Sequence, residues 1–177
     1  MFELHFPQIT WGDIIILKNG NNVALVDTGY EEKYEMLEKY LLQLGVKEIS
    51  FILLTHFHND HYGCIPKLVE NFDVKKVYLK EYSALDKIGS SGELADDNYR
   101  STEQGKWRTI KQLIDDKSKY IRVEETESID FAGFKLKLYG AANTIREIYE
   151  DSGYEEFYHQ IYFSENQNSL AAFMKVN

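Results

Sequence analysis

Cysteine and proline are scarce in this sequence. Its 177 residues include 1 Cys and 2 Pro. The single cysteine, Cys64, cannot form an internal disulfide, and it cannot by itself make a cysteine-rich zinc site. With 44% hydrophobic and 14% aromatic residues, the composition excludes disordered, collagen-like and coiled-coil proteins and is typical of a globular protein.

Long apolar runs and a basic start are also missing. The longest aliphatic stretches, such as residues 14–17 and 51–54, have the length of core strands, whereas a helix needs about 20 apolar residues to cross a bilayer. The N-terminus, Met-Phe-Glu-Leu-His-Phe-Pro, does not resemble a signal peptide. We therefore expect a cytoplasmic protein without a membrane partner.

Positive charge is in deficit. The 20 Lys and Arg residues face 29 Asp and Glu residues, which gives a formal net charge of −9. The average electrostatic field therefore repels nucleic-acid phosphates and anionic lipid headgroups. Nucleic acid is disfavoured as a partner, and an anionic substrate would require a local positive charge such as a metal ion.

Length and hydrophobic patterning predict one layered α/β domain. Globular domains contain roughly 150 residues on average, so 177 residues suit a single domain. Strand and helix patterns alternate through the first half of the chain, and this order favours an α/β architecture. The predicted elements are a hairpin over 13–26 with its turn at 19–22, a helix that buries Tyr34, Leu37, Leu41 and Leu44 and ends before Gly45, an interior strand over 49–54, a helix over 64–71 and a strand over 74–79.

The second half of the chain has weaker patterns. We expect a loop over 86–98, and a plain loop is preferred to a lid over a site. Residues 144–168 are acidic and rich in tyrosine, which favours an interface-forming insertion over a stacking surface for a sugar or base. The remaining predicted elements are a helix over 99–116 with Trp107, Ile110 and Ile114 inward, a hairpin over 128–139 around Gly133, and a last apolar strand over 170–176.

A cluster of potential metal ligands follows the interior strand. Three of the 5 histidines, His56, His58 and His61, lie close together, and Asp60 lies among them. Zinc needs neutral imidazole or carboxylate donors that converge on one point, and a loop that leaves a rigid strand can deliver these four residues to two adjacent points. Two metal ions about 3.5–4 Å apart convert a bridging water into hydroxide, which attacks an ester, amide or phosphodiester without a protein nucleophile. A polar surface loop with coincidental histidines is the disfavoured alternative.

Two sequence elements in this region carry a family resemblance. Thr55-His56-Phe57-His58-Asn59-Asp60-His61-Tyr62-Gly63 resembles the H-x-H-x-D-H-x-G motif of metallo-β-lactamase-fold hydrolases. Upstream, Ala24-Leu25-Val26-Asp27-Thr28-Gly29 resembles the strand-end Asp-x-Gly element of the same family. Two elements in the right order are more specific than one. The resemblance covers about residues 12–80 and extends more weakly through the later strands.

This resemblance implies a fold, a cofactor and a set of site residues. The fold is an αβ/βα sandwich, and the cofactor is a pair of divalent metals, zinc in the first place with manganese or iron as alternatives. His56 and His58 would bind the first metal, and Asp60, also the catalytic residue, would bind the second with His61. Asp27 would support the ligand loop from behind, although it could instead cap the following helix.

The sequence also departs from the family pattern. The family usually supplies a third histidine to the first metal in a Gly-His-Thr-like turn, where this chain has Gly140-Ala141-Ala142-Asn143-Thr144. A bridging aspartate and a final histidine are not recognisable either. Residues 165–173 resemble a strand that precedes the bridging aspartate in the branch similar to the hydrolase domain of DNA-uptake competence proteins. We therefore expect a single domain over 1–177, truncated at its C-terminus, that forms the N-terminal half to two-thirds of the sandwich.

Three other residues could belong to a site, but each has a simpler interpretation. His159 is the only later histidine, and a surface or packed role is favoured for it. His5 alternates with apolar residues in a first strand and is expected on the exposed face. Cys64 follows the metal loop and is expected to be a small buried residue.

Three functions are consistent with these observations. The preferred one is a metal-dependent hydrolase that uses a metal-bound hydroxide on a small-molecule ester or a phosphoester. The alternative is a non-catalytic metal-binding or assembly fragment of such a hydrolase, because ligands of the family are missing. The third is a nuclease, which the net charge of −9 disfavours. Half a sandwich would also expose an apolar face, which predicts a homo-oligomer.

Overall fold

A mixed β-sheet forms the centre of the structure, a computed structural model that describes residues 1–9, 12–80, 110, 112–114, 120–123, 126–140 and 169–175. The sheet has 6 strands in the order β1-β2-β3-β5-β7-β8. The first three strands pair antiparallel, and β3, β5, β7 and β8 run parallel to one another. The strands are β1 (Phe2–His5), β2 (Ile15–Asn19), β3 (Asn22–Val26), β5 (Phe51–Leu53), β7 (Val77–Lys80) and β8 (Tyr120–Val123).

The β2–β3 hairpin has the turn that the sequence predicts. Asn19 pairs with Asn22, so Gly20 and Asn21 form a two-residue turn. Gly20 has a φ of 61°, and tight hairpin turns need such a positive φ because it matches the twist of the flanking strands. The turn therefore fixes the register of the hairpin, in which Val26, the last residue of β3, pairs with Ile15 and is followed by Asp27.

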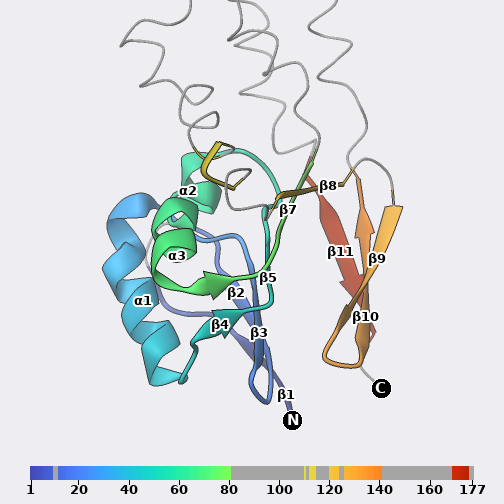
Figure 1. The fold of residues 1–177 in the computed structure, drawn as a ribbon, viewed down its shortest axis with the longest axis horizontal. Coiled ribbons are helices and arrows are strands. Elements are labelled where there is room, and N and C mark those ends of the chain that lie inside the picture. Colours follow the sequence, from blue (N-terminus) through green and yellow to red (C-terminus); the bar gives the residue numbers. More distant parts are fainter. Residues whose placement is uncertain are drawn as a thin grey trace, which may run out of the picture.

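In the part of the chain that the structure describes, helices cover one face of this sheet (Figure 1). A 3-10 turn, η1 (Glu31–Lys33), leads into α1 (Tyr34–Gln43), which buries its apolar side against the sheet and is followed by Gly45 with a φ of 72°. Two shorter helices follow β5, namely α2 (Asn59–Tyr62) and α3 (Ile65–Asn71). Two short strands, β4 (Glu48–Ile49) and β6 (Asp73–Val74), pair parallel to each other. In the chain, β4 directly precedes β5, and β6 directly precedes β7. Their buried side chains form one continuous hydrophobic core with the sheet.

A second sheet packs on the other face of the first (Figure 1). It is antiparallel in the order β11-β10-β9, with β9 (Thr126–Phe131), β10 (Phe134–Tyr139) and β11 (Ala171–Met174). The ring of Phe51 on β5 lies 5.5 Å from that of Phe131 on β9, centroid to centroid. The interior strand β5 is thus buried on both faces, and the apolar face expected for half a sandwich is covered over this core by β9 to β11.

The predicted α/β class is confirmed, and so are the main elements. The strand expected over 49–54 divides at Ser50 into β4 and β5, and the one over 74–79 divides into β6 and β7. Ile110 and Ile114 are buried as expected, whereas Trp107, the loop over 86–98 and the segment over 144–168 lie outside the described residues. Among the described residues, the helices are all too short and too polar to cross a membrane.

Candidate metal centre

The site lies where two parallel strands end side by side. Val26 at the end of β3 pairs with Leu53 at the end of β5, and the main-chain N–H of Asp27 donates to the carbonyl of Leu53 at 2.9 Å. Polar residues that follow neighbouring parallel strands meet at the same edge of the sheet. Asp27 and Thr55 meet there, although 28 positions separate them in the sequence.

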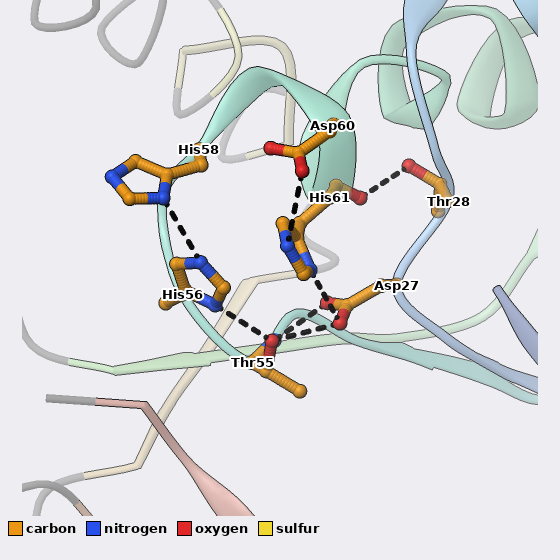
Figure 2. Close-up of polar contacts among 7 residues, drawn as sticks. All are labelled: Asp27, Thr28, Thr55, His56, His58, Asp60 and His61. Atoms are coloured by element: carbon orange, nitrogen blue, oxygen red, sulfur yellow. Dashed lines mark hydrogen bonds and ion pairs between the residues drawn. The ribbon is translucent and has the colours of Figure 1, made fainter. Parts of the chain in front are cut away.

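Asp27 is the buried anchor of this edge. Asp27 is only 3% exposed, and its carboxylate accepts three hydrogen bonds (Figure 2). Thr55 donates two of them, from its main-chain N–H to Oδ1 at 2.8 Å and from its hydroxyl to Oδ2 at 2.7 Å. The backbone of Asp27 has a φ of 57°, a left-handed conformation that is uncommon outside glycine but less so for aspartate. Such strained conformations occur at functional sites, where the surrounding contacts hold them in place.

The short helix α2 is held tightly against the chain that follows β3. Thr28 donates twice to the main-chain oxygen of His61, from its N–H at 2.7 Å and from its hydroxyl at 2.8 Å. A Cβ atom on Gly63 would lie 2.3 Å from the nitrogen of Glu31 and 2.7 Å from the oxygen of Gly29. Only glycine fits at position 63, so the last residue of the motif fixes where α2 lies.

The four predicted ligands come together as two adjacent donor pairs (Figure 2). His56 Nε2 lies 3.1 Å from His58 Nδ1, and His61 Nε2 lies 3.5 Å from Asp60 Oδ2. Two ligand atoms of a tetrahedral zinc with bonds of about 2.0–2.1 Å are about 3.3 Å apart. The rings of His56 and His61 lie side by side, with centroids 4.0 Å apart. The two contacts are a hydrogen bond and an ion pair, and their lengths are also close to the spacing of two ligands on one metal.

Neither pair is a complete metal site by itself. Within the described ranges, no group of three or more His, Cys, Asp and Glu side chains is arranged to hold a metal ion. Imidazole nitrogens and a carboxylate oxygen are suitable zinc ligands, so the donor chemistry fits. Each pair offers two donors, and a metal bound there needs further ligands from elsewhere.

The hydrogen bonds of His61 leave one ring nitrogen for a metal. Its Nδ1 lies 2.8 Å from Asp27 Oδ2, and because a carboxylate only accepts, Nδ1 carries the hydrogen. In the neutral ring, Nε2, the atom near Asp60, then holds the lone pair. This carboxylate–histidine arrangement is the one that commonly orients metal-binding histidines. Burial lowers the pKa of His61, but the Asp27 hydrogen bond and the charges of Asp27, Asp60 and Asp13 outweigh it, and the net pKa is raised.

Each donor pair combines a buried member with a partly exposed one. His56 is 5% and His61 is 8% exposed, whereas His58 and Asp60 are partly open to solvent. Phe57, which lies between His56 and His58 in the sequence, and Tyr62, which follows His61, stack on each other with ring centroids 4.2 Å apart in the helix-side core. The motif therefore alternates residues that anchor the loop with residues that face outward, where a substrate could approach.

The structure also shows the environment of residues for which the sequence predicted a different position or no role. His5 is half-buried rather than exposed, because α1 lies against β1 and Tyr40 contacts its Nδ1 at 3.1 Å. Cys64 is fully buried as expected, and His159 lies outside the described residues. Thr55 and Thr28 received no role from the sequence. Their only sequence signal is that each borders a motif residue at a strand end.

Comparisons with known proteins show which family this chain resembles. A family model described as the metallo-beta-lactamase superfamily matches residues 12–144. The probable metallo-hydrolase YybB of Bacillus subtilis is 38% identical over 71 residues, which cover 40% of this chain and 30% of that protein. The metallo-beta-lactamase fold-containing protein ST1585 of Sulfurisphaera tokodaii is 24% identical over 145 residues, covering 76% of this chain and 49% of that protein.

A solved structure has the same fold. The subclass B3 metallo-beta-lactamase MEM-A1, isolated from a soil metagenome library, superposes with a TM-score of 0.52 at 17% sequence identity. The match covers 78% of this chain and 49% of that enzyme. The chain thus spans about half, or less, of the length of these relatives.

Proposed function

This chain belongs to the metallo-beta-lactamase superfamily, and we propose that it carries the metal-binding loop of a hydrolase that acts on an ester or phosphoester. The observation that supports this proposal is the pair of adjacent donor sets. Four side chains from residues 56–61 form two pairs whose members lie 3.1 and 3.5 Å apart, and the buried carboxylate of Asp27 contacts one of them, His61.

The residues divide between two metals. His56 Nε2 and His58 Nδ1 would hold the first metal, and Asp60 and His61 Nε2 would hold the second. Zinc is the metal that this donor set favours, with manganese or iron as alternatives. A bound pair of divalent metals supplies an acidic water near neutral pH and stabilises negative charge that develops on the substrate.

The protein's own contribution is orientation and access. Asp27 holds the ring of His61 through Oδ2 and the start of the loop through Thr55. Asp60 is the catalytic residue in this proposal, because it is partly open to solvent beside His61 Nε2. A carboxylate there can bind a metal with one oxygen and accept a hydrogen bond from the attacking water with the other. The substrate would be a small-molecule ester or a phosphoester that enters from the side of His58 and Asp60.

Metal content tests this assignment directly. The wild-type chain and a His58→Ala/His61→Ala double variant are dialysed against zinc and manganese, and bound metal is measured by mass spectrometry. We expect the double variant to lose its metal. Circular dichroism checks that it stays folded, because His61→Ala also removes a buried hydrogen-bond partner of Asp27. His5→Ala is the control, since His5 contacts Tyr40 and Glu3 instead of the loop. Unchanged metal content in the double variant would disprove the site assignment.

A non-catalytic role is the second candidate. It is favoured by the presence of two donors per metal, and not three, among the residues that the structure describes. In that case the chain would bind metal or assemble with the rest of a hydrolase without turning over substrate. Hydrolysis of phosphodiester and lactone substrates by the metal-loaded chain would favour the enzyme, whereas metal uptake without hydrolysis would favour the fragment.

A further inference from the structure

We propose that Thr55 is a positioning residue that relays the orientation of Asp27 to His56, so that one buried carboxylate sets the ring tautomers of both donor pairs. This inference rests on the proposed function, because it concerns the same ligands. It assigns a role to a side chain that touches neither a metal nor a substrate, and it links two donor sets that would otherwise be independent.

The relay follows from counting protons on the Thr55 hydroxyl. That hydroxyl has a single hydrogen, which it donates to Asp27 Oδ2 at 2.7 Å. Toward His56 Nδ1, 3.0 Å away, the hydroxyl oxygen can then only accept. Nδ1 of His56 must therefore carry the hydrogen, and its Nε2 keeps the lone pair. The chain of contacts runs from carboxylate to hydroxyl to imidazole (Figure 2).

The same carboxylate oxygen also fixes His61. Asp27 Oδ2 accepts from His61 Nδ1 at 2.8 Å while it accepts from Thr55. In their neutral forms both histidines thus carry their hydrogen on Nδ1 and keep the lone pair on Nε2. In His56 this nitrogen accepts the hydrogen bond from His58 Nδ1, and in His61 it faces Asp60. A single oxygen atom prepares one ligand of each metal, directly in one case and through Thr55 in the other.

Burial makes this relay hard to replace. Asp27, His56 and His61 are each less than a tenth exposed, so water does not readily supply a missing partner. Loss of the Thr55 hydroxyl would remove this acceptor from Nδ1 of His56, and Nε2 could then take the hydrogen instead. A histidine with hydrogen on Nε2 cannot use that atom for a metal. The main-chain N–H of Thr55 still binds Oδ1 of Asp27 in such a variant, which keeps the strand ends together.

The test compares two substitutions at one position. Thr55→Val keeps the shape of the side chain and removes the hydroxyl, whereas Thr55→Ser keeps the hydroxyl and removes a methyl group. Nitrogen-15 NMR of histidine-labelled, metal-free protein at pH 8 reports which ring nitrogen carries the hydrogen. Thr28→Val is the control, because the Thr28 hydroxyl donates to the main-chain oxygen of His61 and not to a ring.

We expect His56 Nδ1 to give the shift of a hydrogen-bearing nitrogen in the wild type, in Thr55→Ser and in Thr28→Val. In Thr55→Val that resonance should move toward the shift of a nitrogen without hydrogen, while the ring of His61 keeps its tautomer. Thr55→Ala, which also lacks the hydroxyl, repeats the test in a smaller side chain. An unchanged His56 tautomer in both variants overturns the relay.

Zinc titration against a chelating competitor provides the second measurement. We expect Thr55→Val to weaken the binding of the first zinc by about 10–100-fold, and Thr55→Ser to restore it. The two proposals can fail separately. If no variant binds metal but the tautomer of His56 changes as expected, the relay stands and the hydrolase assignment fails. If zinc binds equally well to all variants and the tautomer does not change, the relay fails and the metal site stands.

Discussion

At the scale of single residues, Asp27 connects the strand end, Thr55 and His61 through the hydrogen bonds that its carboxylate accepts. It adopts a left-handed backbone conformation, lies buried, and accepts hydrogen bonds from Thr55 and His61. A carboxylate can satisfy these donors because both of its oxygens accept. The local motif is therefore organised around a residue that does not itself have to bind a metal.

Asp27→Asn tests this organisation. One carboxylate oxygen becomes an NH₂ group, which cannot accept from Thr55 or His61, so at least one buried donor loses its partner. We expect a loss of about 1–3 kcal/mol in the free energy of unfolding, together with weaker zinc binding at both donor pairs. Urea denaturation and zinc titration measure the two effects. Glu35→Gln, an exposed substitution on α1, should change neither, and full zinc affinity in Asp27→Asn would contradict this view.

Cys64 provides a residue-scale prediction about pH. Its thiol is fully buried and donates to the main-chain oxygen of Tyr30 at 3.1 Å, and burial raises the pKa of the Cys64 thiol to about 12. An unfolded cysteine ionises near pH 8.5. The unfolded state therefore loses its proton first as pH rises, so the folded state should lose stability between about pH 9 and 12.

Two measurements check this behaviour of Cys64. Iodoacetamide should label the native chain slowly at pH 8 and rapidly in guanidinium chloride, because the thiolate is the reactive form. The fall in unfolding free energy between pH 8 and 10 should be smaller in Cys64→Ala than in the wild type, since the variant has no thiol to ionise. Equal pH slopes in the two proteins would show that Cys64 does not contribute.

At the scale of secondary-structure elements, Gly63→Ala tests how closely α2 approaches the chain after β3. The added Cβ would meet main-chain atoms of Glu31, Gly29 and Asn59 at 2.3–2.7 Å, and backbone cannot move aside as a flexible side chain can. We expect a destabilisation of about 1–3 kcal/mol and weaker zinc binding, because α2 carries Asp60 and His61. Thermal unfolding and zinc titration would measure both.

Gly133→Ala is the matched control for that substitution. Gly133 has a φ of 87°, but a Cβ there would meet no atom within 4 Å. Its cost is therefore conformational strain alone, about 1–2 kcal/mol, and zinc binding should be retained. If both variants kept full zinc affinity, the tight packing at Gly63 would not be what positions the ligands.

The elements also show which parts of the molecule could be predicted from sequence. Periodicity was sufficient for the β2–β3 hairpin, for α1 and for the hairpin around Gly133, because turn residues and apolar spacing are local properties. The candidate ligands could be selected from the sequence because they lie within six consecutive positions, and that they bind a metal stays a prediction. The role of Thr55 could not be predicted, since it depends on the parallel pairing of β3 with β5. The prediction of an exposed His5 was wrong because its partner Tyr40 lies on α1, and a contact between distant segments is not visible in the sequence.

At the scale of the whole molecule, the central sheet is buried on both sides by different means. Helices α1 to α3 cover one face, and β9 to β11 cover the other. The second hairpin was predicted from its alternation, but its packing against Phe51 and Tyr78 was not, because sequence alternation shows that a strand has an apolar face without showing what covers it. The apolar surface available for self-association is therefore to be sought outside this inner face.

The predicted homo-oligomer can be tested at β11, which is an edge strand of the second sheet among the strands that the structure describes. Its residues Ala171, Ala172 and Phe173 are exposed and uncharged, and Phe173 is 58% exposed. Edge strands without charge readily pair with another chain.

We expect the wild-type chain to self-associate in analytical ultracentrifugation and Phe173→Asp to sediment as a smaller species. Leu42→Asp, at an equally exposed position on α1, is the control and should not change the sedimentation. A wild-type chain that stays monomeric at high concentration would contradict the oligomer, and dissociation by Leu42→Asp alone would place the interface on the helical face.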